Sequence, residues 1–326
     1  MLRLRQGHPP DPDRLRAPAL SLRARLSCCD ICPHHCGVDR TRGELGFCKT
    51  GDAIVVAHIG LHTGEEPPIS GTRGSGTIFF AHCNARCVYC QNYQISQRAE
   101  TVRTRTLSPD ELAVEMVGLQ RRGAHNINLV SPTHVIAQVA EGLCLARERG
   151  LTIPIVYNSN GYDALETLRC LDGLIDIYLP DIKYSDDAMA RTYSGIDGYV
   201  EVNRAAIAEM WRQVGDLTLD DDGIARRGLL VRHLVLPGGL AGSRESLAFL
   251  VSLSPGIHVS IMAQYAPHYR ARGMPPLHRP ISPAEYEQVL NDALTLGLEN
   301  GFVQEIASHE QLIPDFEQED PFAAAV

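Results

Sequence analysis

The chain has 326 residues, of which 44% are hydrophobic and 21% charged, and its net charge is −9 at pH 7. These values are ordinary for a globular protein and leave room for one large α/β domain or two modest ones. Its 28 arginines and two lysines are scattered among acidic residues, which argues against a nucleic acid or an anionic membrane as partner. Neither a signal peptide nor an apolar run of about 18 residues is evident, so we expect a cytoplasmic protein.

The N-terminal part contains four closely spaced cysteines. Residues 1–27 are expected to form a tail or a capping helix, and residues 28–63 a cysteine-rich metal-binding module with its linker. The ligands predicted for this module are Cys29, Cys32, Cys36 and Cys48. Four thiolates complete either a tetrahedral zinc site or a [4Fe-4S] cluster. The site then has one of two roles. It either relays electrons or orients substrate, or it has the purely structural role of holding the module on the barrel.

Residues 64–306 alternate short apolar runs with helical patterns, which is typical of a parallel sheet with helical crossovers. The predicted strands are 77–81, 126–130, 153–157, 174–179, 229–236, 258–262 and, as a short seventh, 301–305. The predicted helices are 108–122, 134–149, 163–171, 200–214, 243–253 and one that opens at Ser282. The helices at Ser108 and Ser282 begin with capping boxes that have proline at the first helical position. The expected fold is α/β, a partial (β/α)6 TIM-like barrel, followed by a C-terminal tail over 307–326 that is disordered from Gln318.

A second cysteine group directly follows the first barrel strand. Cys83, Cys87 and Cys90 are spaced C-x3-C-x2-C. Three thiolates cannot saturate a four-iron cluster, so one iron would remain open at the mouth of the barrel. The alternative is a zinc site that His82 or another group completes.

This loop, with an aromatic Tyr89 before its third cysteine, resembles the radical S-adenosylmethionine superfamily. The resemblance implies a [4Fe-4S] cluster, S-adenosyl-L-methionine as cofactor, and catalytic and metal-binding roles for the three cysteines. Asp181 and Lys183 resemble the D-x-K of glycyl-radical activating enzymes, which contacts the ribose and carboxylate of the cofactor. A lysine is informative in a chain that otherwise uses arginine, because it presents a compact ammonium. The alternative for this pair is a surface ion pair.

Further cofactor contacts are expected at the other strand ends. Tyr89 and Asn92 belong to the cysteine loop, and Asn158 begins an N-S-N-G-Y segment that resembles the D-T-N-G-F of pyruvate formate-lyase activating enzymes. Ser131 and Thr133 stand where the superfamily often carries a GGE segment, although Ser131 also fits a helix cap. Candidate substrate-side groups are Glu65, Glu66, His125 and His134, and Gln264 is expected at the mouth.

Residues 28–306 resemble the uncharacterised homologues of pyruvate formate-lyase activating enzyme that carry an N-terminal C-x2-C-P-x2-C-G-V-D-R segment. Here the segment spans 29–40 and is followed by G-E-L-G-F-C over 43–48. The resemblance implies an oxidoreductase that forms a 5′-deoxyadenosyl radical and abstracts hydrogen from a glycyl-radical protein, a small molecule or a peptide. Reduced flavodoxin or ferredoxin is the expected electron donor. The competing class is a non-catalytic iron-sulfur or zinc-binding protein.

Overall fold

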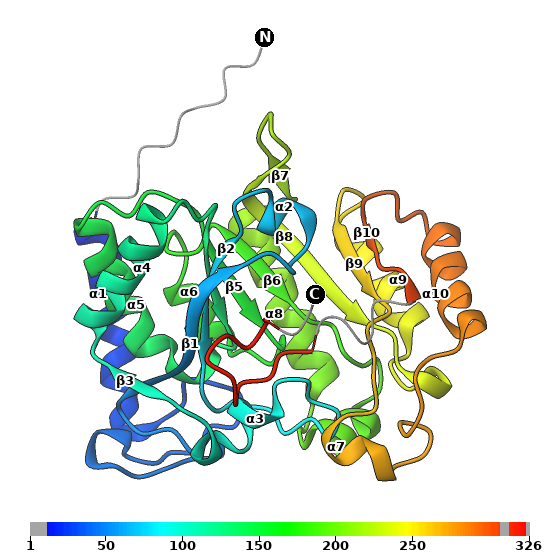
Figure 1. The fold of residues 1–326 in the computed structure, drawn as a ribbon, viewed down its shortest axis with the longest axis horizontal. Coiled ribbons are helices and arrows are strands. Elements are labelled where there is room, and N and C mark those ends of the chain that lie inside the picture. Colours follow the sequence, from blue (N-terminus) through cyan, green and yellow to red (C-terminus); the bar gives the residue numbers. More distant parts are fainter. Residues whose placement is uncertain (1–11, 307–312, 324–326) are drawn as a thin grey trace.

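The computed structural model describes residues 12–306 and 313–323, and a ten-stranded sheet forms its centre. The strand order is β10-β9-β8-β6-β5-β4-β2-β1-β3, and β7 pairs with β8 (Figure 1). The strands are β1 (Ile54–His62), β2 (Ser75–Phe80), β3 (Arg105–Leu107), β4 (Ile127–Val130), β5 (Ile155–Ser159), β6 (Ile177–Pro180), β7 (Thr218–Leu219), β8 (Ala225–Leu234), β9 (His258–Met262) and β10 (Gly301–Val303).

The six parallel strands predicted for the barrel are present as β2, β4, β5, β6, β8 and β9, and the predicted short seventh is present as β10, which is also parallel. Because the strand order is linear and its two ends do not pair, the barrel is partial, as expected. The predicted boundary at residue 64 is wrong, since β1 pairs antiparallel with β2 and β3 pairs with β1. The barrel sheet therefore begins at Ile54, inside the segment assigned to the cysteine module and its linker.

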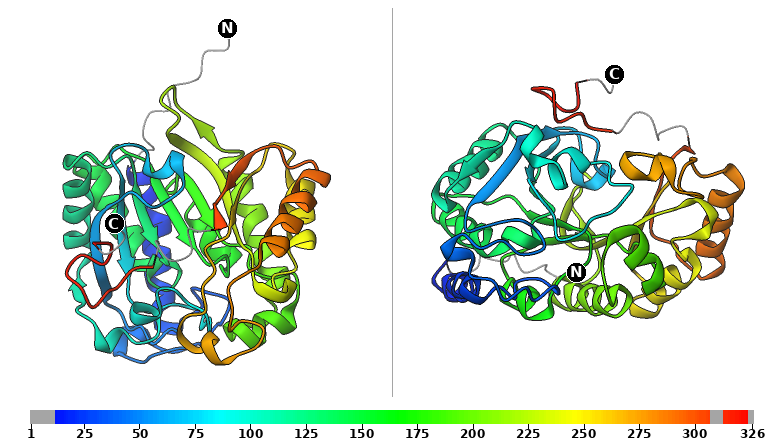
Figure 2. Two further views of the ribbon diagram at one scale, coloured as in Figure 1. Left: turned by 45° about the vertical axis from the view of Figure 1, so that its right-hand side comes forward. Right: turned by 90° about the horizontal axis from the view of Figure 1, so that it is seen from below.

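The longer helices form the outer layer around the strands (Figure 2). The helices of the described chain are α1 (Pro12–Ala24), α2 (Pro67–Ser70), α3 (Tyr93–Ser96), α4 (Pro109–Arg121), α5 (Ile136–Glu148), α6 (Leu165–Cys170), α7 (Asp187–Ser194), α8 (Tyr199–Val214), α9 (Ser243–Leu253) and α10 (Pro283–Thr295). Both capping boxes are confirmed, with Ser108 opening α4 and Ser282 opening α10. The short helices α2, α3 and α7 were not predicted.

The side chains that point into the barrel follow the two-residue period of the strands. At one end an apolar layer includes Val156, Ile177 and Leu230, and Ile69 of α2 packs into it. Because α2 precedes β2, this turn closes the end of the barrel where the strands begin. Two residues further along β5 and β8, the inward positions hold the polar Asn158 and Arg232. The barrel interior thus changes from apolar to polar toward the carboxyl ends of the strands.

Both ends of the described chain pack on the barrel. Helix α1 lies against α5, and Arg23 pairs with Glu141, so a capping helix is the form that the described part of residues 1–27 takes. In the C-terminal segment, Phe316 is buried, and the rings of Phe316 and Phe322 both pack against Phe79 of β2, the first edge-on and the second tilted. The prediction of a disordered tail is therefore wrong for residues 318–323, while 324–326 lie outside the described residues.

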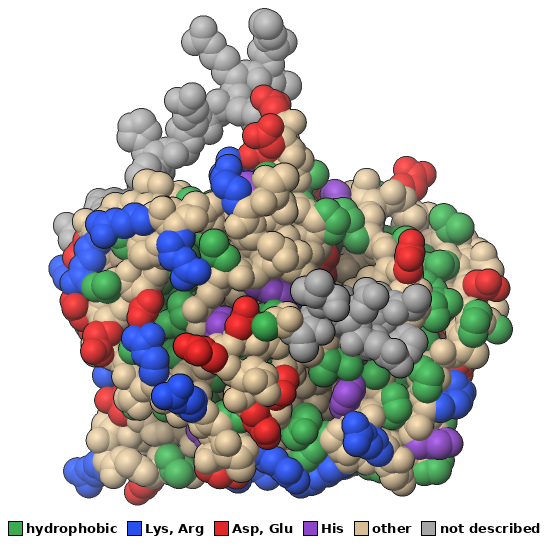
Figure 3. All heavy atoms as spheres, in the orientation of Figure 1, with side chains coloured by type: hydrophobic (Ala, Val, Ile, Leu, Met, Phe, Trp, Pro, Cys, Tyr) green, Lys and Arg blue, Asp and Glu red, His purple; other side chains and the backbone are tan. Residues whose placement is uncertain are grey.

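The outer surface carries charges of both signs. Acidic and basic side chains are interspersed over the face that Figure 3 shows, without a continuous basic surface. Within the described ranges, no helix combines the length and the apolar character that crossing a membrane requires.

Candidate active site

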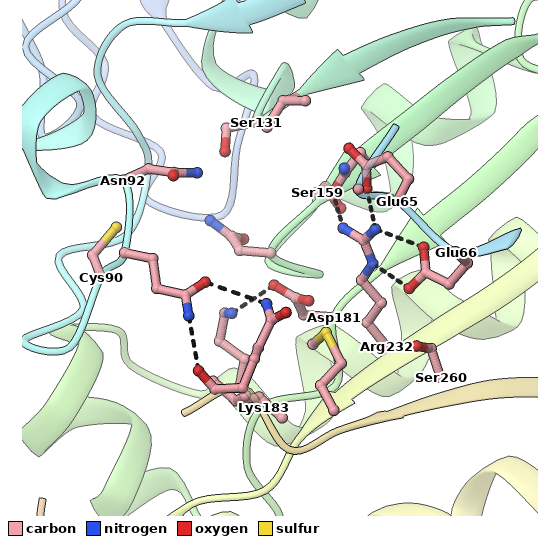
Figure 4. Close-up of a pocket in the computed structure, with 18 of the residues that line it drawn as sticks. Glu65, Glu66, Cys90, Asn92, Ser131, Ser159, Asp181, Lys183, Arg232 and Ser260 are labelled. Carbon is pink, nitrogen blue, oxygen red and sulfur yellow. Dashed lines mark hydrogen bonds and ion pairs between the residues drawn. The ribbon is translucent and has the colours of Figure 1, made fainter. Parts of the chain in front are cut away.

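A cavity of about 630 Å³ opens inside the barrel toward the carboxyl ends of the strands (Figure 4). Its volume falls in the range of small-molecule sites. Nine of the predicted site residues line it: Cys83, Cys87, Tyr89, Cys90, Asn92, Ser131, Asn158, Asp181 and Lys183. Glu65, Glu66 and Gln264 line it as well. The structure thus brings together side chains from five strand ends and from the loop before α2.

Tertiary hydrogen bonds fix the backbone of the cysteine loop. The amide of Arg86 donates to the carbonyl of Ser194 at 2.9 Å, and the amide of Val88 donates to the carbonyl of Tyr193 at 2.8 Å. The amides of Arg270 and Ala271 both donate to the carbonyl of Val88 at 3.0 Å. The loop is therefore anchored to α7 and to the segment after β9, although it has almost no regular secondary structure of its own.

Each of the three sulfur atoms has a polar hydrogen within reach. Asn160 Nδ2 lies 3.4 Å from Cys83 Sγ, Ser194 Oγ lies 3.0 Å from Cys87 Sγ, and Ser96 Oγ lies 3.3 Å from Cys90 Sγ. Hydrogen bonds to the ligand sulfurs are one way in which a protein sets the potential of an iron-sulfur cluster. The donor set therefore fits the cluster that the sequence predicts.

Cys87 is buried and Cys83 and Cys90 are partly buried, and this burial changes the acidity of the three thiols. It raises the pKa of Cys83 to about 12 and that of Cys90 to about 11. The pKa of Cys87 is raised by burial as well, although the nearby Lys183 ammonium acts in the opposite direction. Thiolates are the metal-binding form of cysteine. Buried thiolates need cationic partners, which iron supplies, so the loop is suited to hold a cluster.

A chain of hydroxyl groups connects the Tyr89 side chain to the sulfur of Cys87. Tyr89 Oη lies 2.6 Å from Tyr184 Oη, which lies 2.8 Å from Ser194 Oγ, the neighbour of Cys87 Sγ. Burial raises the pKa of Tyr89 well above its usual value. The neutral phenol therefore presents its ring to the cavity and keeps its hydroxyl in the packed interior.

Asp181 and Lys183 form a buried ion pair at the end of β6. Lys183 Nζ donates to Asp181 Oδ2 at 2.5 Å, and the two side chains are only 14% and 21% exposed. Burial alone would lower the pKa of Lys183, but the Asp181 carboxylate and the Cys87 thiolate outweigh it and raise that pKa. The alternative of a surface ion pair is therefore wrong, because the pair lies on the cavity wall.

The segment around this pair is held rigidly. Asn203 Nδ2 donates to the Asp181 carbonyl at 2.9 Å, and the amide of Lys183 donates to Tyr199 Oη at 2.9 Å. Both partners belong to α8, whose packing on the barrel thus fixes where Asp181 and Lys183 stand. Such support of a polar pair from behind is expected where side chains must hold a ligand in one orientation.

Ser131 occupies a strained position directly after β4. Its φ angle is +56°, in the left-handed region that residues other than glycine rarely adopt. The alternative that Ser131 caps a helix is wrong, because the following 3-10 turn spans Thr133–Val135, has Pro132 at its N-cap and has no side-chain cap. Strained backbone of this kind clusters at functional sites, and Figure 4 shows Ser131 and Asn92 on the same side of the cavity as Cys90.

Three candidates do not reach the cavity. Thr133 is buried and donates to Asp163 Oδ1 at 2.7 Å, so its assignment to cofactor binding does not hold. His134 Nε2 lies 2.8 Å from the Ala81 carbonyl, where it supports the start of the cysteine loop. His125 accepts from the amide of Arg73 at 3.2 Å. The last two residues therefore have structural roles.

Sequence reasoning missed Arg232, which lies on the cavity wall opposite the cysteine loop. Its Nε and Nη2 donate to the two oxygens of Glu66 at 2.8 and 2.6 Å, and Nη2 also donates to Glu65. Its Nη1 lies 3.4 Å from Asn158 Oδ1. The available signal was a charged residue directly after the apolar run 229–231 of strand β8, two residues beyond the inward-facing Leu230.

The four N-terminal cysteines lie near one another in a loop module without strands. Burial raises the pKa of Cys32 to about 12, and Cys48, Cys29 and Cys36 each add to that rise by repulsion. Arg40, itself buried, lies 3.8 Å from Cys29 Sγ and donates to the His134 carbonyl at 2.8 Å. None of the four cysteines lines the barrel cavity. In the described parts of the chain, no three His, Cys, Asp or Glu side chains converge as around a single metal ion.

An aromatic contact joins this module to the cysteine loop of the barrel. The His34 and Phe47 rings stack with their centres 3.8 Å apart. The Arg86 guanidinium also lies over the Phe47 ring, 4.2 Å from its centre. Arg86 also donates to the Phe47 carbonyl at 2.9 Å, and His34 Nε2 lies 2.8 Å from the Asn84 carbonyl. The module is thus docked on residues adjacent to the cavity cysteines.

The comparisons with known proteins agree with this geometry. Residues 77–215, which contain the three cavity cysteines and Asp181 and Lys183, match the sequence profile of the radical SAM superfamily. Two uncharacterised proteins of Methanocaldococcus jannaschii are similar. MJ0674 is 30% identical over 269 residues, 80% of this chain and 73% of its own length. MJ0808 is 27% identical over 173 residues, 49% of this chain and 50% of its own.

Two solved structures show more distant similarity. Streptococcus suis SuiB bound to the precursor peptide SuiA has a TM-score of 0.48 at 12% identity, with 72% of this chain and 49% of SuiB covered. The FeFe-hydrogenase maturase HydG of Carboxydothermus hydrogenoformans has a TM-score of 0.45 at 16% identity, with 68% of this chain and 50% of HydG covered. This chain therefore spans about half the length of these two proteins.

Proposed function

Since this chain belongs to the radical SAM superfamily and is an enzyme, we propose that its barrel cavity cleaves S-adenosylmethionine and directs the resulting radical at a substrate. The observation that carries the proposal is that Cys83, Cys87 and Cys90 line one cavity together with Asp181 and Lys183. The superfamily implies a [4Fe-4S] cluster and S-adenosylmethionine. In this chain we assign the cluster to the three cysteines and the cofactor to the polar residues around them.

Held by Cys83, Cys87 and Cys90, the cluster would supply one electron to cleave S-adenosylmethionine to methionine and a 5′-deoxyadenosyl radical. That radical would take a hydrogen atom from the substrate and become 5′-deoxyadenosine. The cysteine loop offers three sulfur ligands, and so it leaves one iron for the cofactor. The loop is anchored by its amides, which keeps the three sulfurs in place.

Lys183 and Asp181 are proposed to hold the cofactor by its charged and hydroxyl groups. The Lys183 ammonium can donate hydrogen bonds to the carboxylate of the cofactor, and the Asp181 carboxylate can accept them from the ribose hydroxyls. Asn158, Ser131 and Asn92 offer further donors and acceptors on the same cavity wall. Tyr89 supplies a ring whose hydroxyl is turned away into the protein. Because these groups are largely buried, water is kept from the reacting atoms.

The resemblance to pyruvate formate-lyase activating enzyme supports two substrate classes, the glycine of a glycyl-radical protein and a small molecule or peptide. The proposed electron donor is reduced flavodoxin or ferredoxin, and the N-terminal cysteines are assigned to a second [4Fe-4S] cluster or to zinc. A reducing cytoplasm is the proposed location, and it is supported by the ten cysteines, all of which are unpaired.

The test is anaerobic reconstitution with iron and sulfide, reduction with dithionite, and measurement of 5′-deoxyadenosine and methionine after S-adenosylmethionine is added. We expect the wild type to form the two products in equal amounts. A Cys28→Ala control, in which an exposed cysteine outside both groups is removed, should do the same. If the wild type cleaves S-adenosylmethionine no faster than a Cys83→Ala variant does, the proposal is contradicted.

A further inference from the structure

Two glutamates and one arginine form a buried ion cluster on the cavity wall opposite the cysteine loop (Figure 4). The side chains of Glu65 and Glu66 are 8% and 6% exposed, and that of Arg232 is 15% exposed. All three line the cavity. Glu65 and Glu66 follow β1 in the loop that leads into α2, so the turn that closes the barrel also delivers both carboxylates to its interior.

The carboxylates of this cluster outnumber its cations. Arg232 is the one cation that pairs with either glutamate in the described chain, and it pairs with both. Lys183, the other Lys or Arg residue that lines the cavity, pairs with Asp181. His62 also faces Glu65, but burial lowers the pKa of His62, which keeps its ring neutral near pH 7. The cluster therefore has one surplus negative charge.

The surplus charge is not removed by protonation of Glu66. Burial alone would raise the pKa of Glu66, but the Arg232 guanidinium outweighs this and lowers it. Buried charges in proteins are normally compensated, because an unpaired charge is costly to remove from water. A surplus charge retained on the wall of a cavity therefore points to a ligand of opposite sign.

Hydrogen bonding in the cluster indicates the same kind of ligand. Asn128 is fully buried on β4, and its Nδ2 donates to Glu65 Oε1 at 2.9 Å. Its Oδ1 has no hydrogen-bond partner, whereas nearly all buried polar groups in proteins have one. The Nε and Nη2 of Arg232 are already taken by carboxylates. Asn128 itself does not line the cavity, so the acceptors available to a ligand are the carboxylate oxygens of Glu65 and Glu66. With acceptors on the wall and few free donors, the cluster is the reverse of a site for an anion.

We propose that Glu65, Glu66 and Arg232, with Asn128 holding Glu65 in place, form a subsite for a cationic group of the substrate, an ammonium or a guanidinium. Such a group supplies both the missing positive charge and several N–H donors. The subsite shares its cavity with Cys83, Cys87 and Cys90, so it would position a cationic substrate before the cofactor. That the subsite binds substrate rests on the proposed function. The binding of a cation to it can be measured without turnover.

The test compares two probes of nearly the same shape, n-propylguanidinium and its neutral counterpart n-propylurea. Binding to the reconstituted protein is measured by calorimetry with and without S-adenosylmethionine. We expect the wild type to prefer the cation by about tenfold, which corresponds to about 1.4 kcal/mol. Equal binding of the two probes to the wild type would overturn the proposal, and this comparison needs no variant that must fold.

A matched pair of variants locates the effect. Glu65→Gln removes the surplus charge and keeps the shape, whereas Glu115→Gln removes a glutamate that pairs with Arg105 on the surface. We expect Glu65→Gln to reduce the preference to less than threefold, with an unchanged or higher melting temperature, and Glu115→Gln to retain it. An undiminished preference in Glu65→Gln would contradict the assignment.

The cofactor also carries cationic groups, and the same variants separate the two sources. If the subsite serves the substrate, Glu65→Gln leaves the affinity for S-adenosylmethionine unchanged, and propylguanidinium binds in its presence. Loss of cofactor affinity in Glu65→Gln would overturn the proposal, because the cluster would then hold the cofactor. If 5′-deoxyadenosine never forms while the charge preference holds, only the proposed function fails.

Discussion

The two cysteine groups differ in what surrounds them. Cys83, Cys87 and Cys90 follow a buried parallel strand and line a cavity of about 630 Å³. The four cysteines of the N-terminal module lie in loops, and none of them lines that cavity. Three ligands beside a cavity leave a place for a cofactor, whereas four ligands away from it leave none. This difference supports the proposal that the barrel site carries out the chemistry and that the N-terminal site gives support or supplies electrons.

The largest expected effect comes from matched substitutions in the two groups. Cys90→Ala should reduce 5′-deoxyadenosine formation by at least about 10³-fold, because the cavity loses one of its three ligands. Cys36→Ala should keep the rate within about threefold when dithionite, which can reduce a cluster directly, is the electron source. The rate is measured by chromatography on anaerobically reconstituted protein. Equal losses in the two variants would break the distinction between the groups.

A second test uses the only two lysines of the chain, one in each region. Lys183→Met should weaken S-adenosylmethionine binding about 10- to 100-fold, because a buried hydrogen bond to a charged group is worth about 1.5–3 kcal/mol. Lys49→Met, in the exposed part of the module, should leave the affinity unchanged. Equilibrium dialysis measures both, with iron content as the check on cluster assembly. An unchanged affinity in Lys183→Met would remove Lys183 from the cofactor site.

The smallest expected effect concerns the contact between the two regions. Phe47→Ala removes the ring between His34 and Arg86, and we expect it to lower the free energy of unfolding by about 1–2 kcal/mol. Leu45→Ala, at an exposed residue of the same module, is the control and should have little effect. Thermal unfolding of the reconstituted proteins measures the difference. Equal stabilities would show that the module is not held by this contact.

The parts of the fold that were predictable from the sequence depend on local patterns. The parallel strands are buried apolar runs, and the helices after Ser108 and Ser282 begin with capping boxes, so both signals lie within a few residues. Strand β1 was missed because His58, Gly60 and His62 interrupt its apolar residues. Its place beside β2 is set by pairing in the folded chain and not by its own pattern.

The site was predictable where its residues lie in compact motifs, as in the cysteine loop and the Asp181–Lys183 pair. Arg232 was missed because its partners Glu65 and Glu66 are about 166 residues away in the sequence, and only the barrel brings them together. Thr133 was wrongly assigned because the strained backbone at Ser131 is followed by a turn that directs Thr133 toward Asp163. Neither contact has a signature in the local sequence.

The most direct test of the distinction between the two regions is EPR spectroscopy of the dithionite-reduced protein with and without S-adenosylmethionine. We would compare a variant with Cys29, Cys32, Cys36 and Cys48 replaced by alanine with one in which Cys83, Cys87 and Cys90 are replaced. The account predicts a four-iron signal in the first variant that the cofactor shifts, and in the second no signal that responds to the cofactor. A cofactor-dependent shift in the second variant would contradict the assignment of the chemistry to the barrel cavity.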